Sequence, residues 1–317
     1  MQRQLKKMTK KEFLKLVEES HRKKLRLTSK QEKQIREFYN KIYLKLSKKL
    51  SKFDNDKLQE KQLLGILKSI SEDIFTIQNE FEKSFEENMI EIANTANQIQ
   101  LDMLLDLDKK YKLGLGVVLI KIFRDVSSNS VKLIMNGKLY KDNKSLKRRI
   151  RMCLNKLQKD LNYIVRQGAK QNKNNSEIIK DLQTYLKVNS VKSLAWRNSY
   201  PKASKKVDYH MQTICRTSFN HSYQEAQRES CKRNPYVVGI KWLTSNNHKV
   251  CELCKSRDGV IYKIDEVPLD HPRGMCTTIP VLEKELDQIG EELKRWIEGE
   301  SNSKLDNWFN KYGSEFM

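Results

Sequence analysis

The chain has 317 residues, 38% of them hydrophobic and 32% charged, and an excess of 62 Lys and Arg over 40 Asp and Glu gives it a net charge of +22. This length is enough for two domains with a core. The basic excess favours a polyanionic neighbour such as nucleic acid, an anionic membrane surface or an acidic protein, although lysine that only decorates solvated helix faces is the alternative.

Cysteine usage and hydropathy argue against two classes of protein, secreted disulfide-rich proteins and membrane-spanning proteins. Six cysteines at irregular intervals are not typical of a secreted disulfide framework. Residues 1–11 are polar and basic, so we expect no signal peptide and synthesis in a reducing cytoplasm. The most apolar run, residues 113–123, contains Lys121 and is too short to cross a bilayer. We therefore expect no membrane span, and we expect this run to lie in the core.

Proline marks the main boundary along the chain. All five prolines lie at or beyond Pro201, and a helix interior excludes proline by about 3 kcal/mol. We expect an α+β fold that is mainly α, with a long N-terminal helical region before a small module of a helix and a β-hairpin. The predicted boundaries are residues 1–188 for a helical arm or bundle, 189–204 for a linker, 205–282 for the module and 283–317 for a helical tail.

In the first half, apolar residues at steps of three or four predict one long helix over residues 56–108. Its stripe comprises Leu63, Leu67, Ile70, Ile74, Ile77, Phe81, Phe85, Met89, Ile92, Ala96, Ile99 and Met103. Such a stripe needs partner helices, and residues 9–19 and 29–52 are the predicted local partners.

A second periodic helix is predicted over residues 145–169, with Leu146, Ile150, Leu154, Leu157, Leu161 and Ile164 facing inward. Residues 138–180 hold thirteen Lys and Arg against three Asp and Glu, which makes this the most basic part of the chain. The candidate nucleic-acid contacts are Lys147, Arg148, Arg149 and Arg151. Ser176 is predicted to cap a short helix over residues 177–186.

The last third is predicted to mix helix and strand. A helix over residues 205–233 stops at Asn234-Pro235, and strands follow over residues 237–243 and 276–282. Asp258-Gly259 suits a type I′ hairpin turn before the β-prone residues 260–264. Trp242 is expected in the core with Ile240. Residues 283–312 are predicted to form one charged helix or a pair of helices.

Three cysteines and a histidine have metal-ligand spacing. Cys251 and Cys254 form a C-x-x-C pair, and His271 and Cys276 follow at a distance typical of a second ligand pair. Thiolates and an imidazole in this pattern predict a structural Zn²⁺ site. The alternative is a set of packed, reduced thiols with an ordinary hydrogen bond at His271. His248 is a spare donor.

The remaining cysteines and histidines are not expected to bind a ligand. Cys153 and Cys215 fall on predicted helices and Cys231 near a helix end, so packed thiols are the expectation. The other histidines, His21, His210 and His221, have no partner cluster around them in sequence.

About 80 residues resemble the phage Mu F-like minor head, or head-morphogenesis, proteins of tailed bacteriophages. The residues that carry the resemblance are Asp208-Tyr209, Arg216-Thr217-Ser218, His221, Ala226, Asn234-Pro235, Gly239, Trp242, Cys251-x-x-Cys254, Arg257-Asp258-Gly259 and Asp270-His271-Pro272-x-Gly274-Met275-Cys276. Upstream, Asn136-Gly137-Lys138 and Ser145-Leu146-Lys147-Arg148-Arg149-Ile150 are similar to members from phages of low-GC Gram-positive bacteria. One departure is Asn247-His248-Lys249, where the family pattern leads us to expect an aspartate.

The resemblance implies a non-enzymatic virion protein at the head interior or portal vertex, present in the host cytoplasm during assembly. Its implied partners are portal, capsid or scaffold proteins, and packaged double-stranded DNA bound without sequence preference. Two other functions stay open. One is a metal-dependent nuclease of the His-Asn-His type, because C-x-x-C followed by Asp270-His271-Pro272 resembles that motif. The other is a basic DNA-binding protein.

Overall fold

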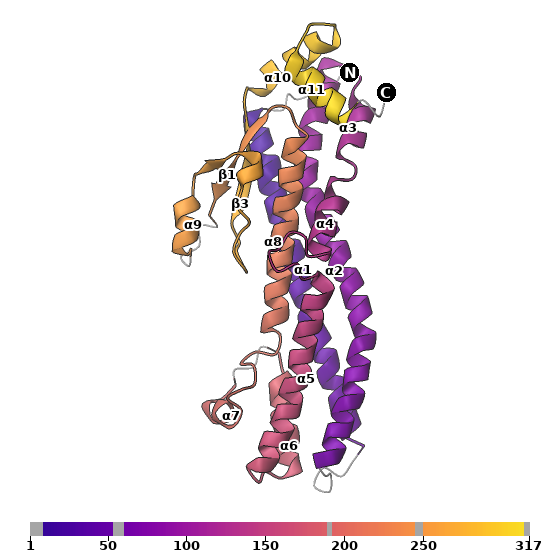
Figure 1. Ribbon diagram of the computed structural model, residues 1–317, viewed down its shortest axis with the longest axis vertical. Coiled ribbons are helices and arrows are strands. Elements are labelled where there is room, and N and C mark those ends of the chain that lie inside the picture. The colour runs from indigo at the N-terminus through magenta and orange to yellow at the C-terminus, as the bar shows by residue number, and fades with distance from the viewer. Residues whose placement is uncertain (1–8, 53–59, 189–191, 245–249, 314–317) are drawn as a thin grey trace, which may run out of the picture. The chain divides into compact units, whose positions relative to one another are not determined.

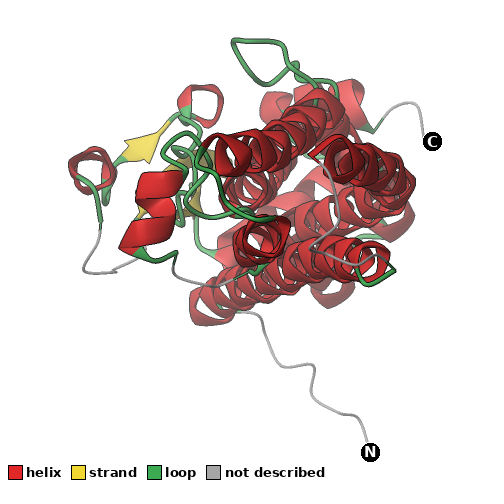
Figure 2. Ribbon diagram, turned by 90° about the horizontal axis from the view of Figure 1, so that it is seen from below, coloured by secondary structure: helices red, strands yellow, loops and turns green. Residues whose placement is uncertain are grey.

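The computed structural model describes residues 9–52, 60–188, 192–244 and 250–313. Most of them are helical, and the strands form one small three-stranded antiparallel sheet after the long N-terminal helical region (Figure 2). The predicted α+β, mainly α fold class is therefore confirmed. Of the helices described, none has the length and apolar character that a membrane crossing requires.

The chain folds into two compact units, each assembled from separate stretches of sequence. The first comprises Met1–Thr28, Asn88–Leu139 and Arg216–Met317, and the second comprises Ser29–Glu87 and Tyr140–Cys215. Three helices contribute residues to both units: α1 (Lys10–Leu50), α2 (Glu60–Tyr111) and α8 (Tyr209–Lys232), all labelled in Figure 1. The domain boundaries placed after residues 188, 204 and 282 stay predictions.

Helix α1 is continuous where two helices were predicted. Residues 20–28 contain no glycine or proline. The Thr28 hydroxyl donates to the Lys24 carbonyl at 2.9 Å, and the Ser20 hydroxyl donates to the Thr95 carbonyl of α2 at 2.7 Å. A Thr hydroxyl bonded to the carbonyl four residues earlier is compatible with a continuing helix, and a Ser hydroxyl bonded to another helix leaves its own backbone free to stay helical. The prediction of separate helices over residues 9–19 and 29–52 was therefore wrong.

Helix α2 carries the predicted stripe, and residue 56, its expected start, lies outside the described residues. The stripe side chains that the structure describes are all buried: Leu63, Leu67, Ile70, Ile74, Phe81, Phe85, Met89, Ile92, Ala96, Ile99 and Met103. The side chain of Ile77 lies outside those described. Residues 113–123 contribute to the core as predicted, because α3 (Gly116–Phe123) buries Leu119, Ile122 and Phe123. Helix α4 (Val126–Met135) follows.

The second unit contains the predicted basic helix as α5 (Leu146–Lys170). Its first turn is capped by the Ser145 hydroxyl, which accepts from the Arg148 amide at 3.2 Å. All six residues predicted to face inward are buried. The cap predicted for the next helix, α6 (Asn175–Leu186), was wrong. Asn174 caps it instead, in a reciprocal capping box with Glu177, because this asparagine, two residues earlier, supplies an equivalent oxygen acceptor.

The segment predicted as a linker, residues 189–204, contains helix α7 (Leu194–Ser199). Trp196 is buried there and stacks on Tyr185 with ring centroids 6.0 Å apart, and it also packs against Tyr200. The aromatic contacts of Trp196 therefore stabilise helix α7, in a segment whose polar composition had predicted irregular structure.

The sheet belongs to the first unit and has the order β2-β1-β3, with β1 (Val237–Leu243) in the centre. Its neighbours are β2 (Ile261–Tyr262) and β3 (Thr277–Leu282), both antiparallel to β1. The strands predicted over residues 237–243 and 276–282 are thus confirmed, as is the burial of Trp242 with Ile240. Figure 1 shows β3 beside α8, to which it is tied where Gln227 Nε2 donates to the Thr278 carbonyl at 3.1 Å.

The predicted hairpin turn differs from expectation in type and in place. Asp258 has φ −60° and ψ 128°, Gly259 has φ +77°, and the Val260 amide donates to the Arg257 carbonyl at 3.1 Å. These angles define a type II turn and not type I′, because only the glycine needs positive φ. The turn follows a short helix, α9 (Glu252–Arg257), so it does not join two strands directly. The β-prone run is also shorter than predicted, because a 3₁₀ turn, η2 (Ile264–Glu266), takes over after β2.

The tail of the described chain is a pair of helices, α10 (Leu286–Ile297) and α11 (Ser303–Tyr312). They pack through Trp296 and Trp308, whose ring centroids lie 6.3 Å apart. Trp308 Nε1 donates to the Arg233 carbonyl at 2.8 Å, which fixes the tail to the end of α8.

Candidate metal centre

Three short elements bring the predicted ligands together. Cys251 is the N-cap residue of α9, and Cys254 occupies the third position of the same helix. His271 lies in the loop after η2, and Cys276 directly precedes β3. A C-x-x-C pair on a first helical turn places both thiols on one side, where the returning loop meets them.

The distances between the predicted ligand atoms permit metal binding. The potential ligand atoms of Cys251, Cys254 and His271 lie within 4.8 Å of one another, and so do those of Cys254, Asp270 and Cys276. Cys251 Sγ is 3.4 Å from His271 Nε2. Tetrahedral zinc with Zn–S near 2.3 Å and Zn–N near 2.0 Å separates two such ligand atoms by roughly 3.5 Å. These five side chains therefore lie close enough to hold a metal ion.

The orientation of His271 suits a ligand that binds through Nε2. Its Nδ1 lies 3.0 Å from the Pro272 carbonyl, which can only accept a hydrogen bond. Nδ1 must therefore carry the proton, and the neutral ring presents the Nε2 lone pair toward Cys251. The same hydrogen bond, reinforced by Asp270 and Cys251, raises the pKa of His271.

Asp270 is a further site residue that we did not predict. It is buried, and its Oδ2 accepts from Asn220 Nδ2 at 2.8 Å and from the Cys276 amide at 3.0 Å. Its Oδ1 accepts from the His271 amide at 2.9 Å. Gly274 is required beside it, because a Cβ there would come within 2.1 Å of the carboxyl carbon. With three N–H donors in place, Asp270 orients the two neighbouring candidate ligands.

Helix α8 docks this loop through a polar stripe, which we define as Thr217, Asn220, His221, Gln224 and Gln227. The Thr217 hydroxyl accepts from the Arg273 amide, His221 Nε2 donates to the Asp270 carbonyl at 2.9 Å, and Gln224 Oε1 accepts from the Asp270 amide at 3.0 Å. All but Thr217 are buried. In the sequence, this stripe could have been recognised from the spacing of three and four between its uncharged polar residues. The hydrogen bond to Asp270 shows that His221 does have a partner at the site.

The electrostatics of the thiols favour a cation. The amide and thiol of Cys254, followed by His271, lower the pKa of Cys251, whereas burial, followed by the neighbouring thiols, raises the pKa of Cys254. Three thiolates beside a buried carboxylate repel one another, and a divalent metal removes that repulsion. The donor set thus fits a soft or borderline ion such as Zn²⁺.

One buried cation lies against the site. Lys24 of α1 is 2% exposed, and its Nζ donates to Asn220 Oδ1 at 2.9 Å and to the Cys276 carbonyl at 3.3 Å. Burial lowers the pKa of Lys24 to about 8, and Asp270 and Cys276 oppose that shift. Lys24 lies more than two hundred positions before the ligands, so local spacing gave no sign of it.

The surroundings of the site are apolar on one side and open on the other. Cys254 and Cys276 pack with Trp242 in a buried cluster. On the other side a hollow of about 540 Å³ borders Cys251, and its lining includes His21, Arg216 and Arg273. His21 thus joins the neighbourhood of the site, which its sequence context did not indicate.

The remaining cysteines and histidines considered in the sequence analysis do not join the candidate metal centre among the residues that the structure describes. Cys215 and Cys231 are buried, and Cys153 is half-buried. Burial raises the pKa of Cys153 to about 11, as expected for a packed thiol. His210 lines a separate hollow in the second unit. His248 lies outside the described residues.

The candidate nucleic-acid residues all lie on α5, but they are not equivalent. Lys147, Arg148 and Arg151 are exposed. Arg149 is half-buried, forms an ion pair with Asp142, and lies 4.6 Å from the Tyr140 ring centroid. Its guanidinium is thus engaged within the second unit.

A longer basic surface continues along α5. We define the α5 ridge as the exposed cations Arg148, Arg151, Lys159, Arg166 and Lys170. At 100° per residue they fall within one face, and at 1.5 Å per residue they span about 33 Å. Within the described part of the chain, no acidic side chain forms an ion pair with any of them.

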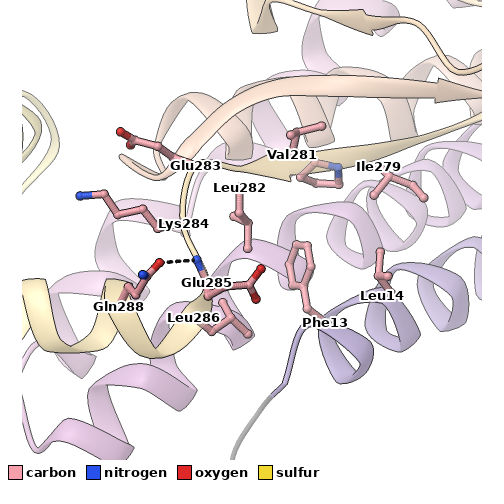
Figure 3. Close-up of a pocket in the computed structure, with 11 residues that line it drawn as sticks. Phe13, Leu14, Ile279, Val281, Leu282, Glu283, Lys284, Glu285, Leu286 and Gln288 are labelled. Carbon is pink, nitrogen blue, oxygen red and sulfur yellow. Dashed lines mark hydrogen bonds between the residues drawn. The ribbon is translucent and has the colours of Figure 1, made fainter.

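A hollow of about 370 Å³ lies elsewhere in the first unit, between the start of α1, β3 and the start of α10 (Figure 3). Phe13 and Leu286 contribute apolar side chains to its lining. Two of its charged lining residues form ion pairs with residues outside the lining, Lys284 with Glu292 and Glu283 with Lys304. It holds no titratable cluster comparable to the metal centre among the residues described.

Comparison with protein-family models, with curated proteins and with solved structures gave no match to this chain.

Proposed function

We propose that Cys251, Cys254, His271 and Cys276 bind one structural Zn²⁺ that holds the loop of residues 250–276 against α8. The observation that carries this proposal is the orientation of His271, whose Nε2 faces Cys251 Sγ at 3.4 Å while Nδ1 is bound to a carbonyl. Four protein ligands leave no open position for a reacting water, which is typical of structural sites.

Removing a ligand tests the zinc site. Protein purified without chelator is expected to contain one equivalent of zinc by elemental analysis. Cys251→Ser and Cys276→Ser are expected to lose it and to lower the free energy of unfolding by several kcal/mol, because metal binding contributes directly to folding. The matched control is Cys231→Ala, which changes a buried thiol packed on Val237 and Ile240 outside the site. Well under half an equivalent of zinc in the unmodified protein would refute the site.

At the level of the whole protein, we propose a phage minor head protein that acts in head assembly, not in chemistry. The closed ligand set supports a structural role, and the resemblance to Mu F-like proteins supplies the context of portal, capsid and packaged DNA. Such a protein would work in the host cytoplasm during assembly and remain in the virion.

Complementation tests this role. A phage that lacks the protein is expected to form few infectious heads, and Cys254→Ser is expected to fail in rescue because the module unfolds. Cys231→Ala is expected to rescue. Full rescue by Cys254→Ser would contradict the structural role of the site.

In the nuclease alternative, His271 would have to activate water, so it would need a ring nitrogen that is free to accept a proton. In our proposal both of its ring nitrogens are committed, Nδ1 to Pro272 and Nε2 to the metal. Incubation of the protein with plasmid and Mg²⁺ or Mn²⁺ is expected to leave the DNA intact. Nicking that depends on His271 would favour the nuclease.

A second candidate function, binding of double-stranded DNA without sequence preference, is favoured by the α5 ridge. Its span of about 33 Å is close to one turn of B-DNA, and unpaired Lys and Arg release counterions from phosphate on binding. Changing Arg148, Arg151 and Lys159 to glutamate is expected to weaken binding alike for all sequences and to flatten its salt dependence. Changing Arg149, which is engaged with Asp142, serves as the comparison. Unchanged binding in a gel-shift salt series would show that the cations of the α5 ridge are solvated surface residues that do not contact DNA.

A further inference from the structure

Lys24 is a buried cation without a carboxylate in direct contact. It is 2% exposed, and no acidic side chain in the described residues forms an ion pair with it. Its ammonium lies over the Tyr223 ring at 4.8 Å and donates to the Asn220 side chain and the Cys276 carbonyl. A buried charge is costly unless other charges compensate it, so this position calls for a nearby negative centre.

That negative centre is the thiolate and carboxylate cluster. Asn220 accepts from Lys24 through Oδ1 and donates through Nδ2 to Asp270 Oδ2 at 2.8 Å and to the Gly274 carbonyl at 3.3 Å. Lys24 therefore reaches Asp270 through one amide, and it reaches Cys276 directly through the carbonyl. Three thiolates and Asp270 carry four negative charges, and a divalent metal offsets two of them.

We propose that Lys24 is the counter-cation and positioning residue of the metal centre, so that metal affinity depends on a side chain supplied by α1. This inference rests on the proposed zinc site. Through its bond to the Cys276 carbonyl, Lys24 fixes the backbone of that ligand, and through Asn220 it fixes Asp270, the carboxylate that orients His271 and Cys276. The ammonium also lowers the net negative charge that the buried centre must carry.

A merely structural lysine, which only joins α1 to α8, would act on folding without acting on the metal. The distinguishing measurement is metal affinity in protein that is folded. Full-length Lys24→Met removes the charge and keeps the length of the side chain. Lys24→Gln keeps hydrogen-bonding capacity without charge. The matched control is Lys23→Met on the same helix, because Lys23 is exposed and forms an ion pair with Glu91 at 3.6 Å, away from the candidate ligands.

Zinc affinity is measured by competition with a chromophoric chelator, and folding is followed by circular dichroism. We expect both Lys24 variants to bind zinc about 10- to 100-fold more weakly, the range typical of residues behind the metal ligands, and Lys23→Met to match the unmodified protein. With Co²⁺ as the probe, the visible absorption of the Lys24 variants is expected to shift, because the Cys276 ligand is no longer held in place.

Each outcome decides between the two roles. Unmodified protein without zinc refutes the metal site itself. Zinc bound normally by the unmodified protein and equally tightly by Lys24→Gln refutes only the role of Lys24. If both Lys24 variants stay unfolded at saturating zinc, Lys24 belongs to core packing and the inference is overturned.

Discussion

At the scale of single residues, Asp270 and Cys276 compete for the same role. Both lie within reach of Cys254, but both oxygens of Asp270 already accept N–H donors from Asn220, His271 and Cys276 itself. A carboxylate engaged by three N–H donors orients ligands better than it replaces one. We therefore keep Cys276 as the proposed fourth ligand.

Substitution separates the two residues. Asp270→Asn is expected to retain one equivalent of zinc with about 10- to 100-fold lower affinity, because it disturbs only the orientation of the ligands. Cys276→Ser is expected to lose the metal on dialysis. Elemental analysis of both proteins checks this, and zinc that stays with Cys276→Ser but leaves Asp270→Asn would make Asp270 the ligand.

His21 gives the first unit a dependence on pH. Burial, followed by the nearby Lys24, lowers the pKa of His21 to about 4, and its Nδ1 is buried without a hydrogen-bond partner among the described residues. The unfolded chain takes up the proton below about pH 6.5, whereas the folded chain does so only near pH 4. Stability from this group is therefore complete above about pH 6.5 and is lost as the pH falls toward 4.

His21→Gln removes this titration. From about pH 7 to about pH 4.5, the urea midpoint of the unmodified protein is expected to fall further than that of the variant. Equal losses in the two proteins would show that His21 is protonated in the folded chain or that carboxylates dominate the decline.

At the scale of secondary-structure elements, the buried faces of the long helices could be predicted from the sequence. The ends of helices and the type of turn were predicted less well. The stripe of α2 and the inward face of α5 followed from steps of three and four, because burial of one face imposes that spacing. The division of α1 was wrong, since residues 20–28 contain no Gly or Pro and the helix continues through them. The type I′ turn was wrong as well, because Asp-Gly also fits a type II turn.

Helix α7 shows what local sequence could not supply. Its stability comes from contacts with residues distant in the chain, such as the stacking of Trp196 on Tyr185. The candidate metal centre likewise contains residues that the sequence indicated and residues that only the fold brings together. Ligand spacing in one loop was visible in the sequence, whereas Asp270, Asn220 and Lys24 acquire their roles only when α1 and α8 meet that loop.

Truncation of Trp196 tests whether α7 is part of the second unit. Trp196→Ala is expected to lower the free energy of unfolding by about 3–5 kcal/mol, as for other buried aromatic residues. Leu194→Ala is the control on the same helix, because Leu194 is 66% exposed and is expected to change stability by less than about 0.5 kcal/mol. Denaturant titration measures both, and a near-neutral Trp196→Ala would support the predicted linker over residues 189–204.

At the scale of the whole molecule, removal of the metal should act on one unit only. The candidate metal centre belongs entirely to the first unit, while α5 and α6 belong to the second. After chelation we expect faster amide hydrogen exchange at His271, Gly274 and Cys276, whose N–H groups are bonded within the loop. Exchange in α5 and α6 is expected to stay unchanged, and general loss of protection would show that the two units unfold together.

The discontinuous composition of the units also sets an order of events during translation. Every stretch of the second unit has left the ribosome once residue 215 has emerged, whereas the first unit still lacks Arg216–Met317. The N-terminal turns of α1, with Lys24 among them, must therefore wait through most of synthesis before Asn220 and Asp270 become available. Metal binding at the proposed site would thus follow the emergence of Arg216–Met317, and until then the side chains of α1 that are buried in the folded first unit, including Phe13 and Val17, would lack the partners that this last stretch supplies.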